Sequence, residues 1–196
     1  MRNLLNVKSI AAAAMAVTVM VSGAIAGEAK VGGEAPDFVL KDIDGKEHKL
    51  SEYTSQGKIV VLEWFNPDCP YVKKHHADKD HRTMANTAEA FKDKNVVWLA
   101  VNSGAPGKQG HGVERNSKAR KDFEIKYPIL MDESGEVGRA YGARTTPHMY
   151  IISEKGTLIF KGGIDNNSHP RKYGEINYVE TALNQHINGE TIEHPE

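Results

Sequence analysis

The chain has 196 residues with 25 basic and 26 acidic side chains, and its formal net charge is −1. This balance gives no electrostatic reason to expect nucleic acid or an anionic membrane surface as a partner. The sequence contains a single cysteine, Cys69. An internal disulfide is therefore excluded, and this one thiol is the first candidate for chemistry.

The N-terminal segment has the pattern of a secretory signal peptide. Arg2 and Lys8 precede an alanine-rich apolar run from Ile10 to about Val21, and small residues at 24–26 offer a cleavage site. We expect a signal peptide at 1–26, cut after Ala26, and export to the periplasm or the medium. The apolar run is too short to predict a membrane span. After the cut we expect no membrane partner.

The mature chain, residues 27–196, is long enough for one domain with a substantial core. The cut removes two basic residues and leaves a net charge of −3. Residues 35–50 alternate apolar and polar side chains around Asp44-Gly45, a pattern that predicts a β-hairpin. A short helical turn at 51–53 is expected to follow.

A buried strand leads to the cysteine. Ile59 to Leu62 are β-branched or aliphatic, and Asn66-Pro67-Asp68 predicts a turn after the strand. Pro70 suits the first position of a helix, which places Cys69 at the N-cap. The positive end of the helix dipole favours the thiolate form of such a cysteine, and Lys73 adds a cation one turn later. The sequence therefore predicts an activated cysteine.

The predicted elements after Cys69 alternate between helix and strand. The helix continues to about Lys92, although the polar stretch Asp78–Arg82 predicts a break. A buried parallel strand at 95–101 is followed by a Gly-, Ser- and Pro-rich loop at 102–112, the place where open α/β sheets form binding crevices. The remaining predictions are a charged helix at 113–124, a short edge-like segment at 127–131, a helix at 134–141, hairpin strands at 149–152 and 157–161, and a helix at 177–188.

The segment from Lys58 to His76 resembles the active-site segment of the thioredoxin-like superfamily, in which a strand and an aromatic pair lead to Cys-x-x-Cys at a helix start. Glu63 stands six residues before Cys69, where those proteins carry a buried acid. The resemblance implies that Glu63 accepts protons behind the cysteine. Val72 stands where the second cysteine would be. Any chemistry at Cys69 therefore needs a thiol from a partner.

Thr146-Pro147 is the second point of resemblance. The matching Thr-Pro pair of the superfamily has a cis peptide bond and lies against the cysteine, which implies that the Thr146 backbone is free to pair with an extended substrate. The N-terminal hairpin resembles the redoxin, or peroxiredoxin-like, branch that includes alkyl hydroperoxide reductases and thiol-specific antioxidant proteins. The implied fold is a thioredoxin-like three-layer α/β sandwich, a central mixed sheet with an added N-terminal β-hairpin.

Peroxiredoxins place their reactive cysteine in a Pro-x-x-x-Thr-x-x-Cys frame. Here Leu62 and Asn66 occupy the two frame positions. Asn66 is able to donate a hydrogen bond in place of the threonine, and Arg144 is a candidate for the cation that orients a peroxide. A peroxide therefore stays beside a disulfide as a possible substrate.

Several histidines raise the question of a metal. A set of Cys and His side chains is able to bind copper or zinc. The second cysteine is missing, and neighbouring helical side chains diverge by about 100°, so the sequence favours solvated surface histidines and predicts no metal and no cofactor. The histidines concerned are His75, His76, His81, His111 and His148. Asp165-Asn166-Asn167 is interpreted as a turn outside the site.

Two function hypotheses follow. In the first, an exported single-cysteine thiol oxidoreductase acts on disulfides or peroxides, and an external thiol or thioredoxin-like reductant resolves the intermediate. Cys69 attacks, Glu63 manages protons, and Thr146 and Pro147 position the substrate. In the second, the chain is a non-catalytic thioredoxin-fold binding module for an exported polypeptide. A copper-binding protein is a less favoured alternative.

Overall fold

The computed structural model describes residues 28–196, and the predicted signal peptide lies outside them. Seven strands form one mixed sheet in the order β2-β1-β5-β4-β3-β6-β7. Their bounds are β1 Val39–Asp42, β2 Glu47–Lys49, β3 Ile59–Trp64, β4 Val96–Asn102, β5 Ile129–Met131, β6 His148–Ile152 and β7 Leu158–Gly162. Within residues 28–196, no helix has both the length and the apolar character that crossing a membrane requires.

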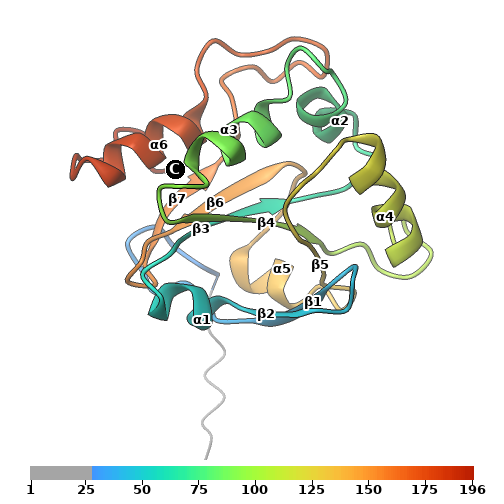
Figure 1. Ribbon diagram of the computed structural model, residues 1–196, viewed down its shortest axis with the longest axis horizontal. Coiled ribbons are helices and arrows are strands. Elements are labelled where there is room, and N and C mark those ends of the chain that lie inside the picture. Colours follow the sequence, from blue (N-terminus) through green and yellow to red (C-terminus); the bar gives the residue numbers. More distant parts are fainter. Residues whose placement is uncertain (1–27) are drawn as a thin grey trace, which may run out of the picture.

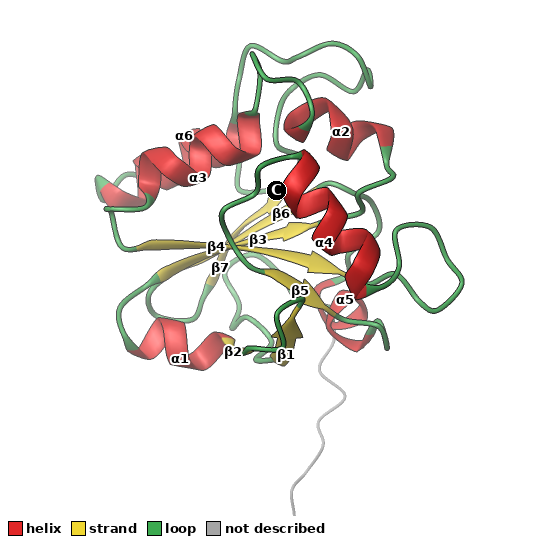
Figure 2. Ribbon diagram, turned by 45° about the vertical axis from the view of Figure 1, so that its right-hand side comes forward, coloured by secondary structure: helices red, strands yellow, loops and turns green. Residues whose placement is uncertain are grey.

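Helices cover both faces of this sheet. On one face lie α2 (Pro70–His76), α3 (Thr83–Phe91), α4 (Val113–Asp122) and α6 (Tyr178–Ile187), and on the other lie α1 (Leu50–Ser55) and α5 (Glu136–Tyr141) (Figures 1 and 2). The result is three layers. Every residue of the central strand β3 is buried, so helices are needed on both faces of the sheet.

Side chains of β3 alternate between the two helical layers. Leu62 and Trp64 pack in a core with Leu50 and Tyr141, on the side of α1 and α5. Val61 belongs to the opposite core, which α3 and α6 cover. Because strand side chains alternate, Glu63 also points to that second layer. The acid is therefore directed at the layer that contains α2, the helix that begins after Cys69.

The predicted order of strands and helices is confirmed, with one difference. The segment expected to be edge-like is β5, which pairs with β1 on one side and β4 on the other. The N-terminal hairpin adds to the sheet there and forms its edge, with Gly45 at a φ of 83° in the turn. The break predicted in the polar stretch after Cys69 is present, since residues 77–82 separate α2 from α3.

Candidate active site

Cys69 lies at the N-cap of α2, with Pro70 at the first helical position. Its backbone is extended, with φ −67° and ψ 128°, and its N–H donates to the carbonyl of Asn66 at 3.1 Å. The side chain makes no capping hydrogen bond. Instead the thiol donates to the carbonyl oxygen of Thr146 at 3.0 Å, and the residue is partly exposed. The thiol is thus held in place and within reach of solvent.

The Thr146–Pro147 peptide bond is cis, and β6 begins at the next residue, His148. His148 of β6 pairs with Trp64 of β3 in the sheet. This pairing places the cis-proline turn beside the end of β3, the strand that precedes Cys69. The sequence implied a free Thr146 backbone. In the structure its carbonyl accepts the Cys69 thiol, which occupies one of the two lone pairs of that oxygen.

The loop before Cys69 is fixed from two sides. Asn66 accepts the N–H of Asp68 at 2.9 Å and donates to the carbonyl of Gln109 at 3.4 Å. A hydrogen bond from Arg115, together with its charge and that of Lys73, lowers the pKa of Asp68 against the effect of burial. Lys73 itself is exposed on α2. The donor that was expected to face a peroxide, Asn66, is engaged with the 103–112 loop.

Glu63 is fully buried and has three hydrogen-bond donors around its carboxylate. The His76 ring contacts one oxygen at 2.6 Å, and Trp98 and Tyr127 donate to the other at 3.1 and 2.9 Å. Burial acts to raise the pKa of Glu63, but the charge of His76 and the three hydrogen bonds outweigh it, so the pKa is lowered. A carboxylate stabilised in this way is a weak base. Through these contacts the carboxylate joins α2 to β3, β4 and the segment before β5.

Val72 lies in the first turn of α2, three residues after Cys69. Its side chain has no exposed surface and belongs to an apolar cluster with Phe65, Ala119 and Phe123, against which Cys69 also packs. This position is therefore part of the core. Pro70, by contrast, contributes through its backbone, because it starts the helix at the residue after the thiol.

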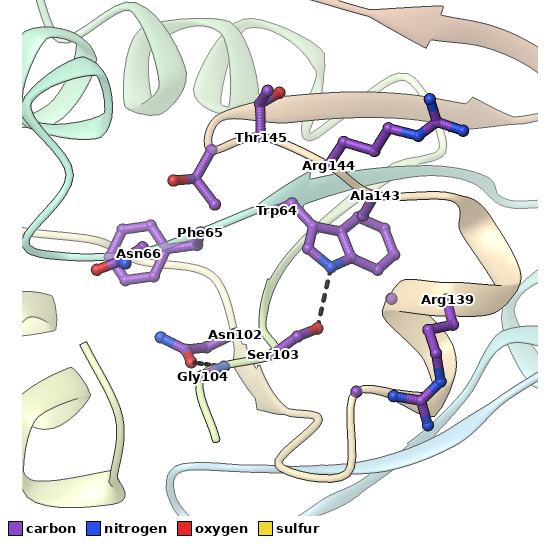
Figure 3. Close-up of a pocket in the computed structure, with 13 residues that line it drawn as sticks. Trp64, Phe65, Asn66, Asn102, Ser103, Gly104, Arg139, Ala143, Arg144 and Thr145 are labelled. Carbon is purple, nitrogen blue, oxygen red and sulfur yellow. Dashed lines mark hydrogen bonds between the residues drawn. The ribbon is translucent and has the colours of Figure 1, made fainter. Parts of the chain in front are cut away.

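Arg144 does not approach Cys69. Its guanidinium pairs with Glu28 at 3.2 Å, and its side chain is 77% exposed. Glu28 also pairs with Lys161 at 2.7 Å. In Figure 3 the head of Arg144 points away from Asn66 and Thr145. The structure therefore separates the two groups, Asn66 and Arg144, that were expected to orient a peroxide together.

The prediction of surface histidines is wrong for His75 and His76, both of which are buried. His75 contacts the Thr83 hydroxyl at 3.1 Å through Nδ1, and burial lowers its pKa to about 4. His76 lies between Phe65 and Phe123, with its Nδ1 buried and unpartnered among the described residues. From the sequence we expected these histidines on an exposed helix. In the structure a loop and another helix cover the two sides of α2.

Residues 165–167, which we interpreted from the sequence as a turn outside the site, include a bend at Asn166 and line a cavity on the α2 side of the cis-proline turn. Asp165 pairs with Lys74 of α2 at 2.9 Å, and both side chains are almost completely buried. The Lys74 ammonium also donates to the carbonyl of Asn167 at 2.8 Å. Tyr173 donates to the carbonyl of Lys74 at 2.9 Å and to Asp78 at 2.8 Å. The 163–175 loop is thereby fastened along α2.

Two cavities meet at Thr145 and Thr146. The α2 cavity, of about 620 Å³, lies between α2, the cis-proline turn and the 163–168 loop. Its lining includes Tyr71, Lys74, His75, Pro147, Ile164 and Asp165. The α5 cavity, of about 320 Å³, lies between the ends of β3 and β4 and helix α5 (Figure 3). Thr146 lines both cavities and its carbonyl accepts the Cys69 thiol, so the sulfur contacts a residue that the two cavities share, although Cys69 itself lines neither of them.

Within residues 28–196, no group of three or more His, Cys, Asp or Glu side chains is close enough together to hold a metal ion. The histidines near Cys69 have other partners. His111 contacts the carbonyl of Gly104 at 2.8 Å, and His148 contacts the Tyr150 hydroxyl at 2.9 Å. His81 stacks on Tyr173 with ring centroids 4.2 Å apart.

Comparison with known proteins agrees with this geometry. Residues 31–161 match the AhpC/TSA family. The chain is 32% identical over 128 residues to the thiol-disulfide oxidoreductase ResA of Geobacillus thermodenitrificans, an alignment that covers 65% of this chain and 66% of that relative. The match therefore spans slightly less than two thirds of the relative's length.

Solved structures show the same fold. An uncharacterized conserved protein from Geobacillus kaustophilus is 25% identical with a TM-score of 0.72, and the match covers 83% of this chain and 85% of that one. A putative thioredoxin from Neisseria meningitidis is 25% identical with a TM-score of 0.56, over 80% of this chain and 89% of that one. The thioredoxin-like fold predicted from the sequence is confirmed.

Proposed function

The chain belongs to the AhpC/TSA family, and on that premise we propose that it is an exported thiol-disulfide oxidoreductase that works with one cysteine. The observation that carries the proposal is the position of Cys69, a partly exposed residue at a helix N-cap, whose thiol contacts the carbonyl of Thr146, a residue that lines two cavities. The name of the Geobacillus relative, thiol-disulfide oxidoreductase, supports the same reaction class. The predicted signal peptide supports export.

In the proposed reaction, the Cys69 thiolate attacks one sulfur of a substrate disulfide. The Cys69–substrate disulfide forms as the substrate's own S–S bond breaks, and the other half of the substrate leaves as a thiolate. No second cysteine exists to attack the intermediate. An external thiol therefore releases the substrate, and a second equivalent of that thiol restores Cys69. In total, two external thiols are oxidised to a disulfide for each substrate disulfide that is reduced.

Several neighbours take positioning roles in this reaction. The carbonyl of Thr146 and the ring of Pro147 line the α2 cavity, and we assign the substrate to it. Pro70 starts helix α2 directly after Cys69, and the backbone N–H of Lys73, one turn further on, donates to the Cys69 carbonyl at 2.9 Å. We assign Glu63 to holding α2 in place, because its oxygens already accept three hydrogen bonds. A disulfide is favoured over a peroxide as substrate, since the Asn66 amide already donates to the Gln109 carbonyl and the head of Arg144 points away from Asn66 (Figure 3).

The proposal is tested by steady-state reduction of a small test disulfide with an external thiol as electron donor. The wild-type chain is expected to accelerate the reaction, and Cys69→Ser is expected to lose that acceleration. An equal rate with Cys69→Ser would overturn the proposal. The binding-module alternative rests on the buried Val72 in place of a second cysteine. It predicts that Cys69→Ser keeps both the binding of an exported polypeptide and the cellular phenotype.

A further inference from the structure

The α5 cavity is lined by charge of one sign only. Arg139 and Arg144 belong to its lining, and no Asp or Glu does. In Figure 3 Arg144 lies above and Arg139 below the level of the Trp64 indole, both on the side away from Asn66. The α2 cavity differs, because its cation Lys74 is neutralised by Asp165. The other residues that line the α5 cavity are Phe65, Asn66, Asn102, Ser103, Gly104, Gly135, Gly138, Ala143, Thr145 and Thr146.

Both arginines have unused capacity for an anion. Arg139 donates to the carbonyl of Ser134 at 3.0 Å and makes no ion pair with any other described residue. Arg144 pairs only with Glu28 in the part of the chain that the structure describes. That pair is 3.2 Å long and its arginine is 77% exposed, and an exposed ion pair of this kind contributes little to stability. An incoming carboxylate is therefore able to compete for either guanidinium.

One acid, Asp132, is buried behind the residues that line the cavity and is hydrogen-bonded there. Its carboxylate accepts the Ser103 hydroxyl at 2.7 Å and the N–H of Gly138 at 2.8 Å. Ser103 in turn accepts the indole N–H of Trp64 at 3.0 Å. These bonds hold Ser103 and Trp64, two residues of the lining, in place. The charged side chains of the lining itself are Arg139 and Arg144.

We propose that the α5 cavity binds the carboxylate of the external thiol, and that this thiol is a small molecule with a carboxylate near its sulfur. The inference rests on the proposed function, which needs an external thiol. The cavity volume of about 320 Å³ lies at the lower end of the range for small-molecule sites. Its lining includes Thr146, whose carbonyl holds the Cys69 thiol, so a thiol anchored at the rim is directed toward the mixed disulfide. The substrate occupies the α2 cavity on the other side of Thr146.

The step that the cavity would assist is a simple exchange. The external thiolate attacks the sulfur of Cys69, a new disulfide forms between the two, and the bound group leaves as a thiolate. To observe the step alone, Cys69 is first converted to its thiopyridyl disulfide with 2,2′-dithiodipyridine. Release of thiopyridone is then followed with 3-mercaptopropionate as the anionic thiol and with 2-mercaptoethanol as the neutral one, at equal thiolate concentrations.

The ratio of the anionic to the neutral rate constant is expected to exceed one in the wild-type chain and to fall with added salt. Arg139→Gln and Arg144→Gln are each expected to lower the ratio by up to about fivefold, and Arg139→Lys is expected to restore most of it. Arg171→Gln is the matched control, since Arg171 is exposed and lines neither cavity. Its ratio is expected to equal that of the wild type.

The outcomes separate the two proposals. Formation of the thiopyridyl adduct together with a ratio of one, unaffected by the arginine substitutions, would overturn the assignment of the α5 cavity and leave the oxidoreductase proposal intact. Failure of Cys69 to form the adduct, or of any thiol to release it, would instead contradict the proposed function itself. A ratio that falls equally with Arg171→Gln would show a general effect of net charge and would also overturn the assignment.

Discussion

The ammonium group of Lys74 and the carboxylate of Asp165 lie 2.9 Å apart, although the two residues are 91 positions apart in the chain. Their ion pair joins the helix that begins after Cys69 to the loop that forms one wall of the α2 cavity. Asp165 also accepts the backbone N–H groups of Asn167 and Gly174 at 3.1 and 2.8 Å. The pair therefore fixes the shape of the cavity that we assign to the substrate.

Removing one partner of this ion pair is expected to destabilise the folded chain. Lys74→Met leaves a buried carboxylate without its cation and is expected to lower the free energy of unfolding by about 3 to 5 kcal/mol. The double variant Lys74→Met/Asp165→Asn is expected to be more stable than Lys74→Met alone, because the uncompensated charge is gone. Denaturant unfolding measures the free energy of unfolding of the wild type, the single variant and the double variant. Lys73→Met, at the exposed neighbouring position, is the control and is expected to differ from the wild type by less than about 1 kcal/mol.

The burial of His75 predicts a pH dependence of stability. Its pKa is lowered from 6.5 to about 4 in the folded chain, so between these pH values the unfolded state binds a proton that the folded state does not. The free energy of unfolding is therefore expected to fall as pH is lowered from 6.5 to 4, by up to about 3 kcal/mol from this residue. His75→Gln is expected to reduce that slope. His169→Gln, at an exposed position, is the control, and an unchanged slope in His75→Gln would contradict the prediction.

The lowered pKa of Glu63 predicts a second change of stability with pH, at more acidic pH than that of His75. The pKa of Glu63 is lowered in the folded chain, so its contribution is present above the unfolded value of about 4.3 and is lost as pH falls through the lower folded value. At pH 7, Glu63→Gln is expected to cost about 3 kcal/mol, because an amide cannot accept from all three donors. The difference in free energy of unfolding between Glu63→Gln and the wild type is expected to become smaller below about pH 4. Thermal unfolding at several pH values measures it, with exposed Glu190→Gln as control. A difference that widens in acid would contradict the prediction.

Val72→Cys tests the geometry of the helix start. Residues 69 and 72 lie one turn apart, and a disulfide is possible at Cα separations of about 4.4 to 6.8 Å. We expect Val72→Cys to allow an internal disulfide under mild oxidation and to add dithiol-driven reductase activity toward a test disulfide. Thiol titration before and after oxidation measures the bond. If the two thiols remain free under conditions that oxidise ordinary Cys-x-x-Cys sites, Cys69 does not point toward position 72 and the site assignment fails.

Sequence reasoning predicted the elements whose signals are local. The apolar run at β3, the Asp-Gly turn of the hairpin and the proline after Cys69 each act within a few residues, and the structure has the corresponding strand, turn and helix start. Glu63 was placed correctly as a buried acid because it interrupts an apolar strand. Its partners were not predicted, since Trp98 and Tyr127 come from later parts of the chain.

The errors all concern contacts over long sequence distances. His75 and Lys74 stand in a polar run that is typical of an exposed helix, and nothing near them indicates that the 163–175 loop covers it. The interior position of β5 was missed for the same reason. A run of three strand residues does not show that the N-terminal hairpin pairs with it.

The central claim is that Cys69 forms a mixed disulfide with its substrate and that an external thiol releases it. Intact-mass analysis of the chain after incubation with an excess of a small test disulfide measures this most directly. The account predicts that the mass rises by one half of the disulfide, that Cys69→Ser stays unmodified, and that a thiol added afterwards restores the original mass. A wild-type chain that stays unmodified, or an adduct that no thiol removes, would contradict it.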